Sequence, residues 1–365
     1  MRILKLNVEN YRNIENISIE PSESVNVIYG ENAQGKTNLI EAMWLFTGCK
    51  SFRGAKDSEL INFEKDFSCL SLDFFGEERQ QNATIKISDK RHAQLNGVDL
   101  TACSKLVGKF LAMVFSPVHL NLVKGGPVER RKFIDTAICQ LKPKYSGYIK
   151  EYSKVLSQRN ALLKDVNYHS ELFDTLEIWE DRLCQLGAVI IDQRMKYIAL
   201  LNESAKEIYS GLSQGREEFD VSYLQNAQID CNSSIEDIKN QLKQSILKAR
   251  KNDIFCGSTS IGPHRDDLNI TIDKVSARSF GSQGQQRSGA LALKMSEASL
   301  IKSVGGEQPV ALLDDVMSEL DINRQDYILN HIDGWQVFIT CCEPDSVLRM
   351  CEGKAFKIEN GKLKV

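Results

Sequence analysis

The sequence contains no C-x-x-C pair, no long apolar run and little net charge, and each absence removes a class of function. Its ten cysteines are spread irregularly over 365 residues. Zinc sites and disulfide frameworks need closer sets, so we expect reduced thiols. No stretch approaches the ~20 apolar residues that cross a membrane, and the residues after Met1 alternate like a strand instead of forming a secretory leader. We therefore expect a cytoplasmic protein with no membrane partner.

The formal net charge of −3 gives no support to nucleic-acid binding, so any DNA contact must come from a local basic patch. Residues 130–164 contain nine Lys and Arg residues against two acidic ones, and residues 239–251 contain five basic residues and no acidic one. Such patches can hold phosphates without reading the base sequence. A solvated helix face gives the same pattern, and the residues alone leave both interpretations open.

Hydrophobic spacing divides the chain into three parts. Residues 1–127 alternate as strands around one helical stretch at 35–48. Residues 128–252 are helical, and an apolar seam from Leu172 to Tyr197 is typical of either a short coiled coil or an ordinary helical bundle. Residues 253–365 return to strands, with a helix at 286–303 and a final hairpin turning at Asn360-Gly361. The predicted fold class is α/β, with a helical subdomain inserted into the α/β part.

The strongest motif lies between an apolar strand at 25–29 and the first helical stretch. Gly30-Glu31-Asn32-Ala33-Gln34-Gly35-Lys36-Thr37 matches the phosphate-loop pattern G-x-x-x-x-G-K-[ST]. The glycines let backbone N–H groups wrap phosphates, and the helix that follows adds its positive end. We expect Lys36 to contact the β- and γ-phosphates and to act in catalysis, and the Thr37 hydroxyl to ligate Mg²⁺. The motif predicts that all eight residues bind ATP.

An acidic partner for this loop follows a second buried strand. Residues 310–313 form a continuous apolar run, as in a strand buried on both faces of a parallel sheet, and Asp314 and Asp315 come directly after it. Carboxylates in that position are costly unless they meet a cation. We expect Asp314 to bind Mg²⁺ with Thr37, and Asp315 to orient the attacking water. Because Lys36 and Asp314 lie far apart in the chain, we expect the helical insert to interrupt an ATPase core.

A third motif opens the helix before this acidic strand. Ser282-Gln283-Gly284-Gln285 combines a good N-cap serine with a glycine that permits close backbone approach. The motif resembles the signature of ABC-type ATPases, which caps the γ-phosphate of ATP held by a partner chain. A helix N-terminus presented to an anion is the physical basis of that contact. The resemblance implies an ATP-dependent homodimer in which these four residues act across the interface.

Two further features bear on ATP turnover. Ser318-Glu319-Leu320-Asp321 resembles the D-loop of the same ATPases, whereas the switch histidine of the next strand is missing and Thr340 ends that strand instead. We expect Thr340 to sense the γ-phosphate and hydrolysis to be slow. No Q-loop glutamine can be assigned, although Phe115-Ser116-Pro117 marks the expected region.

Together these motifs resemble the RecF family of SMC-like recombination-mediator ATPases over the whole chain. The resemblance implies that Arg12 and Asn13 also contact ATP. Its most distinctive string is residues 261–268, where His264 and two aspartates predict a structured polar loop in preference to a metal site. The strings that carry the resemblance, besides those above, are Asn10-Tyr11-Arg12-Asn13, Phe115-Ser116-Pro117, Gly126-Pro127, Arg130-Arg131, Gln158-Arg159-Asn160 and Ile261-Gly262-Pro263-His264-Arg265-Asp266-Asp267-Leu268.

The resemblance also implies a fold and a function. The fold is an ABC-type (SMC/RecF-like) P-loop ATPase head formed by residues 1–127 and 253–365, with a helical arm at 128–252. The activity is ATP-dependent dimerisation and binding of double-stranded DNA at single-strand gaps, with weak, DNA-stimulated ATP hydrolysis used as a switch. The expected partners are RecR and RecO, which help to load RecA in support of replication restart and the SOS response.

Three alternatives stay open from the residues alone. An ABC transporter subunit would carry the switch histidine that this chain lacks. An SMC-type structural ATPase would need a much longer helical insert, and a nuclease with the same head would need a second acidic cluster.

Overall fold

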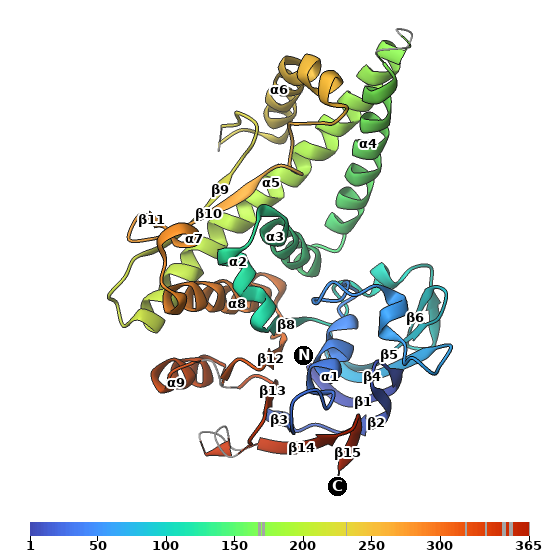
Figure 1. Ribbon diagram of the computed structural model, residues 1–365, viewed down its shortest axis with the longest axis vertical. Coiled ribbons are helices and arrows are strands. Elements are labelled where there is room, and N and C mark those ends of the chain that lie inside the picture. Colours follow the sequence, from blue (N-terminus) through green and yellow to red (C-terminus); the bar gives the residue numbers. More distant parts are fainter. Residues whose placement is uncertain are drawn as a thin grey trace. The chain divides into compact units, whose positions relative to one another are not determined.

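The computed structural model describes residues 1–166, 169, 172–230, 232–317, 320–332, 334–344, 348–349 and 353–364 (Figure 1). The strands are β1 Arg2–Tyr11, β2 Ile14–Ile19, β3 Val25–Tyr29, β4 Ser68–Gly76, β5 Arg79–Ile87, β6 Arg91–Leu95, β7 Val98–Leu100, β8 Ala112–Phe115, β9 Phe219–Leu224, β10 Asp267–Ile272, β11 Val275–Ser276, β12 Val310–Asp314, β13 Val337–Cys341, β14 Gly353–Glu359 and β15 Lys362–Lys364. The α-helices are α1 Lys36–Leu45, α2 Asn121–Lys124, α3 Pro127–Leu141, α4 Tyr145–Asp165, α5 Leu172–Ser213, α6 Ile235–Cys256, α7 Ala277–Phe280, α8 Gln283–Gly305 and α9 Ile322–His331. Short 3-10 helices lie at Asp57–Leu60, Cys103–Leu106 and Pro117–Leu120.

The chain divides into two compact units, called here the head and the arm. The head consists of Met1–Leu120, Glu207–Glu217 and Gln283–Val365, and the arm of Asn121–Lys206 and Glu218–Ser282. This division differs from the predicted ranges: residues 121–127 and 253–282 lie with the arm, and residues 207–217 lie with the head. Residues 253–282 lie with the arm because β10 joins β9 along its whole length, from Asp267 opposite Leu224 to Ile272 opposite Phe219.

One sheet of the head carries the motif-bearing strands. Its order is β15-β14-β3-β13-β12-β8, and all neighbours except β15 run parallel. The strand before the phosphate loop, β3, therefore lies one strand away from the acidic strand β12, with β13 between them. Because parallel strands end at the same edge, the residues that follow β3, β12 and β13 come together there, as the apolar run of β12 predicts.

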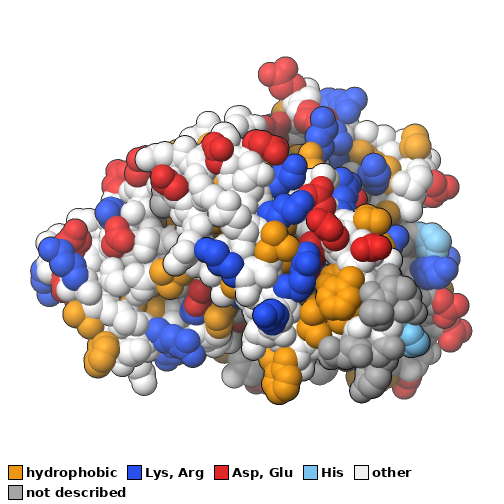
Figure 2. Space-filling model, turned by 90° about the horizontal axis from the view of Figure 1, so that it is seen from above, with side chains coloured by type: hydrophobic (Ala, Val, Ile, Leu, Met, Phe, Trp, Pro, Cys, Tyr) orange, Lys and Arg blue, Asp and Glu red, His pale blue; other side chains and the backbone are white. Residues whose placement is uncertain are grey.

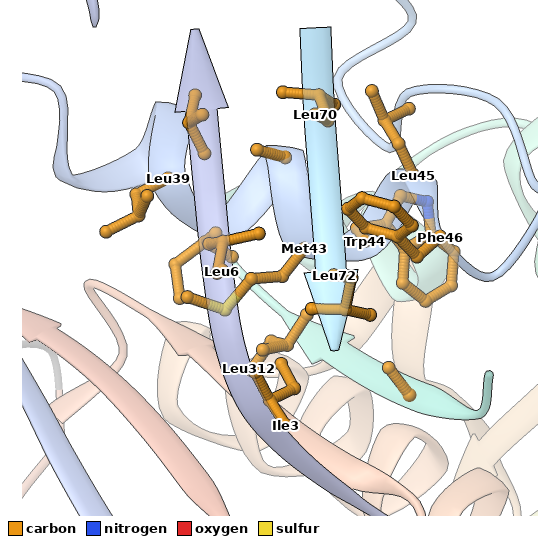
Figure 3. Packing of buried hydrophobic residues seen from close by; sticks show 14 of the residues in the cluster. Ile3, Leu6, Leu39, Met43, Trp44, Leu45, Phe46, Leu70, Leu72 and Leu312 are labelled. Atoms are coloured by element: carbon orange, nitrogen blue, oxygen red, sulfur yellow. The ribbon is translucent and has the colours of Figure 1, made fainter. Parts of the chain in front are cut away.

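A second, antiparallel sheet in the head has the order β2-β1-β4-β5-β6-β7. Helix α1 packs against β1 of this sheet and against β12 and β13 of the first. It is therefore buried on nearly all sides, from Leu39 to Leu45, which explains why its sequence shows no polar face. Figure 3 shows side chains of β1, β4, α1 and β12 meeting in this core, among them Ile3, Leu6, Met43, Leu72 and Leu312.

The arm is built on α4, the first part of α5, and α6. The predicted seam on α5 is confirmed as a buried stripe that includes Leu183, Leu186 and Ile190, whereas the side chain of Leu172 lies outside the described residues. At Gly187 the helix has neighbours on two sides, because an added Cβ would lie 2.8 Å from Leu242 of α6 and 3.4 Å from Tyr152 of α4. This arrangement is a helical bundle. Among the described helices, none combines the length and apolar character that a membrane crossing needs.

A buried ion-pair network joins the three arm helices. The Arg159 guanidinium of α4 is fully buried and donates to Asp253 of α6, to Glu180 of α5 and to the Thr259 hydroxyl, each at 2.8 Å. Arg250 of α6 also pairs with Glu180. A buried charge of this kind is tolerated only while its partners are present.

The polar string at 261–268 forms a structured loop, as predicted. The ring of His264 lies between the Tyr152 hydroxyl, 2.8 Å from Nδ1, and the Thr259 carbonyl oxygen, 3.0 Å from Nε2. Burial lowers the pKa of His264 to about 4, so the ring is neutral near pH 7. The two carboxylate oxygens of Asp267 accept hydrogen bonds from Nε and Nη2 of the Arg130 guanidinium. The described residues contain no cluster of three metal-ligating side chains.

The Arg159 network predicts a large and local loss of stability. Arg159→Ala leaves Asp253 buried without its cation, and we expect about 3–5 kcal/mol of lost protection in the arm. The matched control is Arg182→Ala, which removes the exposed pair with Glu151 and should cost less than about 1 kcal/mol. Hydrogen exchange of the α4 and α6 amides measures both changes. Equal effects of the two substitutions would contradict the assigned role of Arg159.

Candidate functional site

The phosphate loop has the backbone that its glycines predict. Gly30 and Gly35 adopt φ values of 148° and 112°, and Ala33 between them has a φ of 66°. At Gly30 a Cβ would lie 2.2 Å from the carbonyl oxygen of Ile358 in β14, so no other residue fits there. The glycine positions thus follow from chain geometry as well as from the motif.

The Lys36 ammonium lies inside this loop. Lys36 is buried, and its Nζ donates to the carbonyl oxygens of Gly30 at 2.6 Å and Glu31 at 2.8 Å. The buried ammonium group and the backbone N–H groups at the start of α1 are the hydrogen-bond donors that phosphate oxygens require. The residues present therefore fit a bound polyphosphate.

Asp314 links two strands and the helix after the phosphate loop at the edge of the sheet. It is the last residue of β12, and its Oδ1 accepts the hydroxyl of Thr37 in α1 at 2.9 Å and the hydroxyl of Thr340 in β13 at 2.9 Å. Burial raises the pKa of Asp314 above its ordinary value of 3.8, while the two hydroxyl donors act in the opposite direction. A buried carboxylate beside a threonine hydroxyl is an oxygen-ligand pair that fits Mg²⁺.

Asp315, directly after Asp314, has a left-handed backbone with a φ of 53°. Its backbone N–H donates to the Thr340 hydroxyl at 2.8 Å. The Thr340 hydroxyl therefore bridges the two acidic residues, and it holds the turn that directs the chain away from β12. Both Asp315 and Thr340 line the same cavity as the phosphate loop.

The turn after β1 lies against the phosphate loop, where the family resemblance places Arg12 and Asn13. The Asn13 amide donates to the carbonyl oxygen of Ala33 at 3.2 Å. Arg12 donates twice to Glu41 of α1, at 2.6 and 3.2 Å, and the Glu41 side chain is fully buried. Arg12 is therefore fixed by an ion pair that sequence motifs did not indicate.

A cavity of about 570 Å³ runs along these residues. It collects most of the predicted nucleotide-binding residues, while Gly30 and Glu31 contribute through their carbonyl contacts with Lys36. The sequence motifs did not mark the other residues that line the cavity. A basic residue in the loop after α1 could have pointed to Arg53, but no sequence feature pointed to Ile61, Asn62 or Phe63. The predicted residues in the lining are Arg12, Asn13, Asn32, Ala33, Gln34, Gly35, Lys36, Thr37, Asp315 and Thr340, and the missed ones are Asn38, Arg53, Glu59, Ile61, Asn62 and Phe63.

The predicted signature opens α8 as expected. Helix α8 begins at Gln283, directly after the exposed Ser282. The Gln285 amide donates to the Glu217 carboxylate at 2.9 Å. Residues 283–285 are not among the described residues that line this cavity.

The other motifs of the turnover machinery are only partly described. Ser318 and Glu319 of the predicted D-loop lie outside the described residues. Asp321 caps α9 by accepting the backbone N–H of Arg324. Phe115 and Pro117, in the expected Q-loop region, line a small hollow together with Asp315 and Arg287. No glutamine is among the described residues of that hollow.

The family model described as RecF/RecN/SMC N terminal domain matches residues 2–363. The DNA replication and repair protein RecF of Agathobacter rectalis is 39% identical over 369 residues, which covers 100% of this chain and 99% of that protein. The protein of the same name from Acetivibrio thermocellus is 40% identical and covers 94% of each chain. The chain belongs to the RecF family. Its members in this comparison carry the name DNA replication and repair protein, and the full-length match favours repair over a transporter subunit.

Solved structures agree with the assignment to the RecF family. The recombination mediator protein RecF-ATPrS in the RecFOR pathway matches with a TM-score of 0.92 and 36% identity, over 99% of this chain and 97% of that one. The RecF-ATP structure of the same pathway matches with a TM-score of 0.90. An Smc head domain with an extended coiled coil from Pyrococcus furiosus matches at 17% identity with a TM-score of 0.56, which shows the fold alone. The ABC-type (SMC/RecF-like) head is therefore confirmed.

The buried carboxylate of Asp314 predicts a pH-dependent stability. Because the folded state raises its pKa, the folded protein binds the proton more tightly than the unfolded chain, and stability falls as the pH rises above the ordinary value of 3.8. Asp314→Asn removes this cost. We expect its melting temperature to exceed that of the unchanged protein in metal-free buffer, by a margin that grows from pH 4 toward neutral pH.

The control for this experiment is Asp89→Asn, which changes an exposed aspartate in the turn after β5. Thermal unfolding over a series of pH values measures both variants. A margin for Asp314→Asn that shrank as the pH rose would contradict the assigned burial cost.

Proposed function

We propose that this protein is an ATP-dependent DNA-binding protein of recombinational repair, in which nucleotide binding controls association of two copies. The observation that carries the proposal is the convergence of Lys36, Thr37 and Asp315 on one cavity, with Asp314 hydrogen-bonded to Thr37 at its edge. The RecF relatives with ATP or ATPrS in their structures support the choice of nucleotide.

The residues divide the work of binding ATP. The backbone of residues 30–35 and the Lys36 ammonium hold the phosphates, and Arg12 and Asn13 form the neighbouring wall. Thr37 and Asp314 would hold Mg²⁺, and an ion bound there would supply positive charge to neutralise the phosphate oxygens. Since Asp314 already accepts two hydroxyls, its orientation is set before any ligand arrives.

Dimerisation follows from the position of the signature. Ser282, Gln283, Gly284 and Gln285 form a helix start that is suited to an anion, with Ser282 and Gln283 exposed and Gly284 and Gln285 partly buried. This helix start is not among the described residues that line the cavity of its own chain. The helix start of a second copy would therefore contact the γ-phosphate. The homodimer is therefore stable only while ATP is bound.

Hydrolysis would be weak and would reset the switch. Asp315 accepts a proton from, or orients, the attacking water, and its backbone is held by Thr340 at the position of the missing histidine. A threonine hydroxyl cannot carry a positive charge as a protonated imidazole can. The presence of threonine in place of the histidine supports slow ATP turnover. Duplex DNA would stimulate that turnover.

The arm offers a narrower DNA surface than its composition suggests. Arg130 and Arg159 are buried in ion pairs, and Lys239, Lys243 and Arg250 pair with acidic residues. Lys150, Lys154 and Lys164 of α4 remain exposed and form no ion pair with a described residue. Figure 2 shows Lys and Arg side chains interspersed with Asp and Glu on the face seen from above. We therefore propose that these three lysines of α4 contact DNA phosphates.

We infer the cellular role from the solved RecF relatives. The solved RecF proteins belong to the RecFOR pathway. We accordingly place this protein in the cytoplasm at the duplex edge of single-strand gaps. With RecO and RecR it would help to load RecA and thereby support replication restart and the SOS response.

Two substitutions test the nucleotide switch. Lys36→Met removes the phosphate-binding cation, so the variant should stay monomeric with Mg-ATP. Asp315→Asn should still bind ATP but hydrolyse it at least about tenfold more slowly and persist as a dimer. Molecular mass in solution, with and without Mg-ATP and a gapped duplex, measures the assembly of both variants, and release of inorganic phosphate measures their ATP turnover. Normal ATP turnover by Asp315→Asn would overturn the role of Asp315.

The DNA surface is tested by salt dependence. Lys150→Gln combined with Lys154→Gln should lower the slope of log affinity against log salt by about 2, whatever the DNA sequence. Lys86→Gln with Lys90→Gln, which changes two exposed lysines of the head, is the control. Fluorescence anisotropy with a gapped duplex measures the slopes, and equal slopes for both variants would exclude α4 as the contact.

A further inference from the structure

The cavity of the head continues past the phosphate loop to a segment that the motifs did not mark. Ile61, Asn62 and Phe63 line it together with Arg12 and the loop residues. Its volume of about 570 Å³ lies within the range of whole-ligand sites, whereas residues 32–37 line only part of it. A bound nucleotide therefore has room for its base beside the second segment.

Phe63 is the aromatic residue among the described lining residues, and its side chain is fully exposed. It sits at the corner of a turn in which the Lys65 N–H donates to the Asn62 carbonyl oxygen at 3.0 Å. Such corners favour Gly, Pro, Asn, Asp and Ser, and an aromatic ring there gains nothing from the fold. The ring is thus available to a ligand.

The segment that presents the ring is anchored. The Asn62 N–H donates to the Asn10 carbonyl oxygen at 3.0 Å, and the Arg12 N–H donates to the Leu60 carbonyl oxygen at 2.9 Å. Leu60 between them is fully buried. Phe63 is therefore held next to the same turn that carries Arg12 and Asn13 to the phosphate loop, and its backbone position depends little on the loop's own flexibility.

We propose that Phe63 is the base-stacking residue of this nucleotide site. The phosphates anchor at residues 30–37, and the purine lies against the face of the Phe63 ring, which holds it by stacking and removes the ring from water. This inference rests on the proposed binding of ATP and adds a residue that determines affinity for the nucleoside part of the ligand.

The proposal separates two parts of the ligand, so two probes test it. Phe63→Ala should weaken binding of Mg-ATP about tenfold or more, on the scale of one lost base–aromatic stack, and leave binding of inorganic triphosphate with Mg²⁺ unchanged. Phe63→Tyr, which keeps the ring, should bind ATP within about twofold of the unchanged protein. Calorimetric titration of the full chain measures each of these binding constants.

A matched control and a spectroscopic readout complete the test. Phe255→Ala removes another largely exposed phenylalanine, on α6 of the arm, and should leave ATP binding unaltered. Phe63→Trp should add indole fluorescence that ATP quenches and triphosphate does not.

Equal ATP affinity of Phe63→Ala and the unchanged protein would overturn the stacking role while leaving the phosphate site intact. Equal losses for ATP and triphosphate would overturn it as well, because the ring would then act on the loop. If the unchanged protein bound neither probe, the proposed function itself would fail.

Discussion

The shared hydrogen bonds on Asp314 are the contact on which the site depends. One carboxylate oxygen accepts the hydroxyl of Thr37 in α1 and the hydroxyl of Thr340 in β13, which belong to different parts of the chain. Burial raises the pKa of Asp314, so the fold carries an electrostatic cost at this position. That cost is offset when a cation binds, which makes ligand affinity and head stability two aspects of one arrangement.

Local chemistry made the centre of the site predictable. A phosphate loop demands glycines at positions of unusual backbone, and an apolar strand ending in two carboxylates indicates a cation site when a phosphate loop is present in the same chain. Both patterns are visible in short windows, and the structure brings Lys36, Thr37, Asp314 and Asp315 together as expected. The walls of the cavity were not predictable, because the pairing of Arg12 with Glu41 and the anchoring of Phe63 beside β1 depend on contacts between distant residues.

The same limit explains what sequence reasoning misjudged in the arm. A count of basic residues treats Arg159 and Lys154 as equals, yet one is buried among carboxylates and the other is exposed. Helical spacing located α3, α4 and α5, but it gave no sign that β9 and β10 pair across an intervening helix and draw residues 253–282 into the arm. A count of basic residues indicates a DNA-binding surface only when the buried and ion-paired residues are left out of the count.

The strand order of the motif-bearing sheet has a consequence for synthesis on the ribosome. β3, which leads into the phosphate loop, pairs on one side with β13 and on the other with β14, and both are made only after residue 336. During translation the nascent loop therefore waits without its flanking strands while every residue of the arm emerges first. A chain released early, before β13 and β14, would expose both edges of β3 and retain a complete arm.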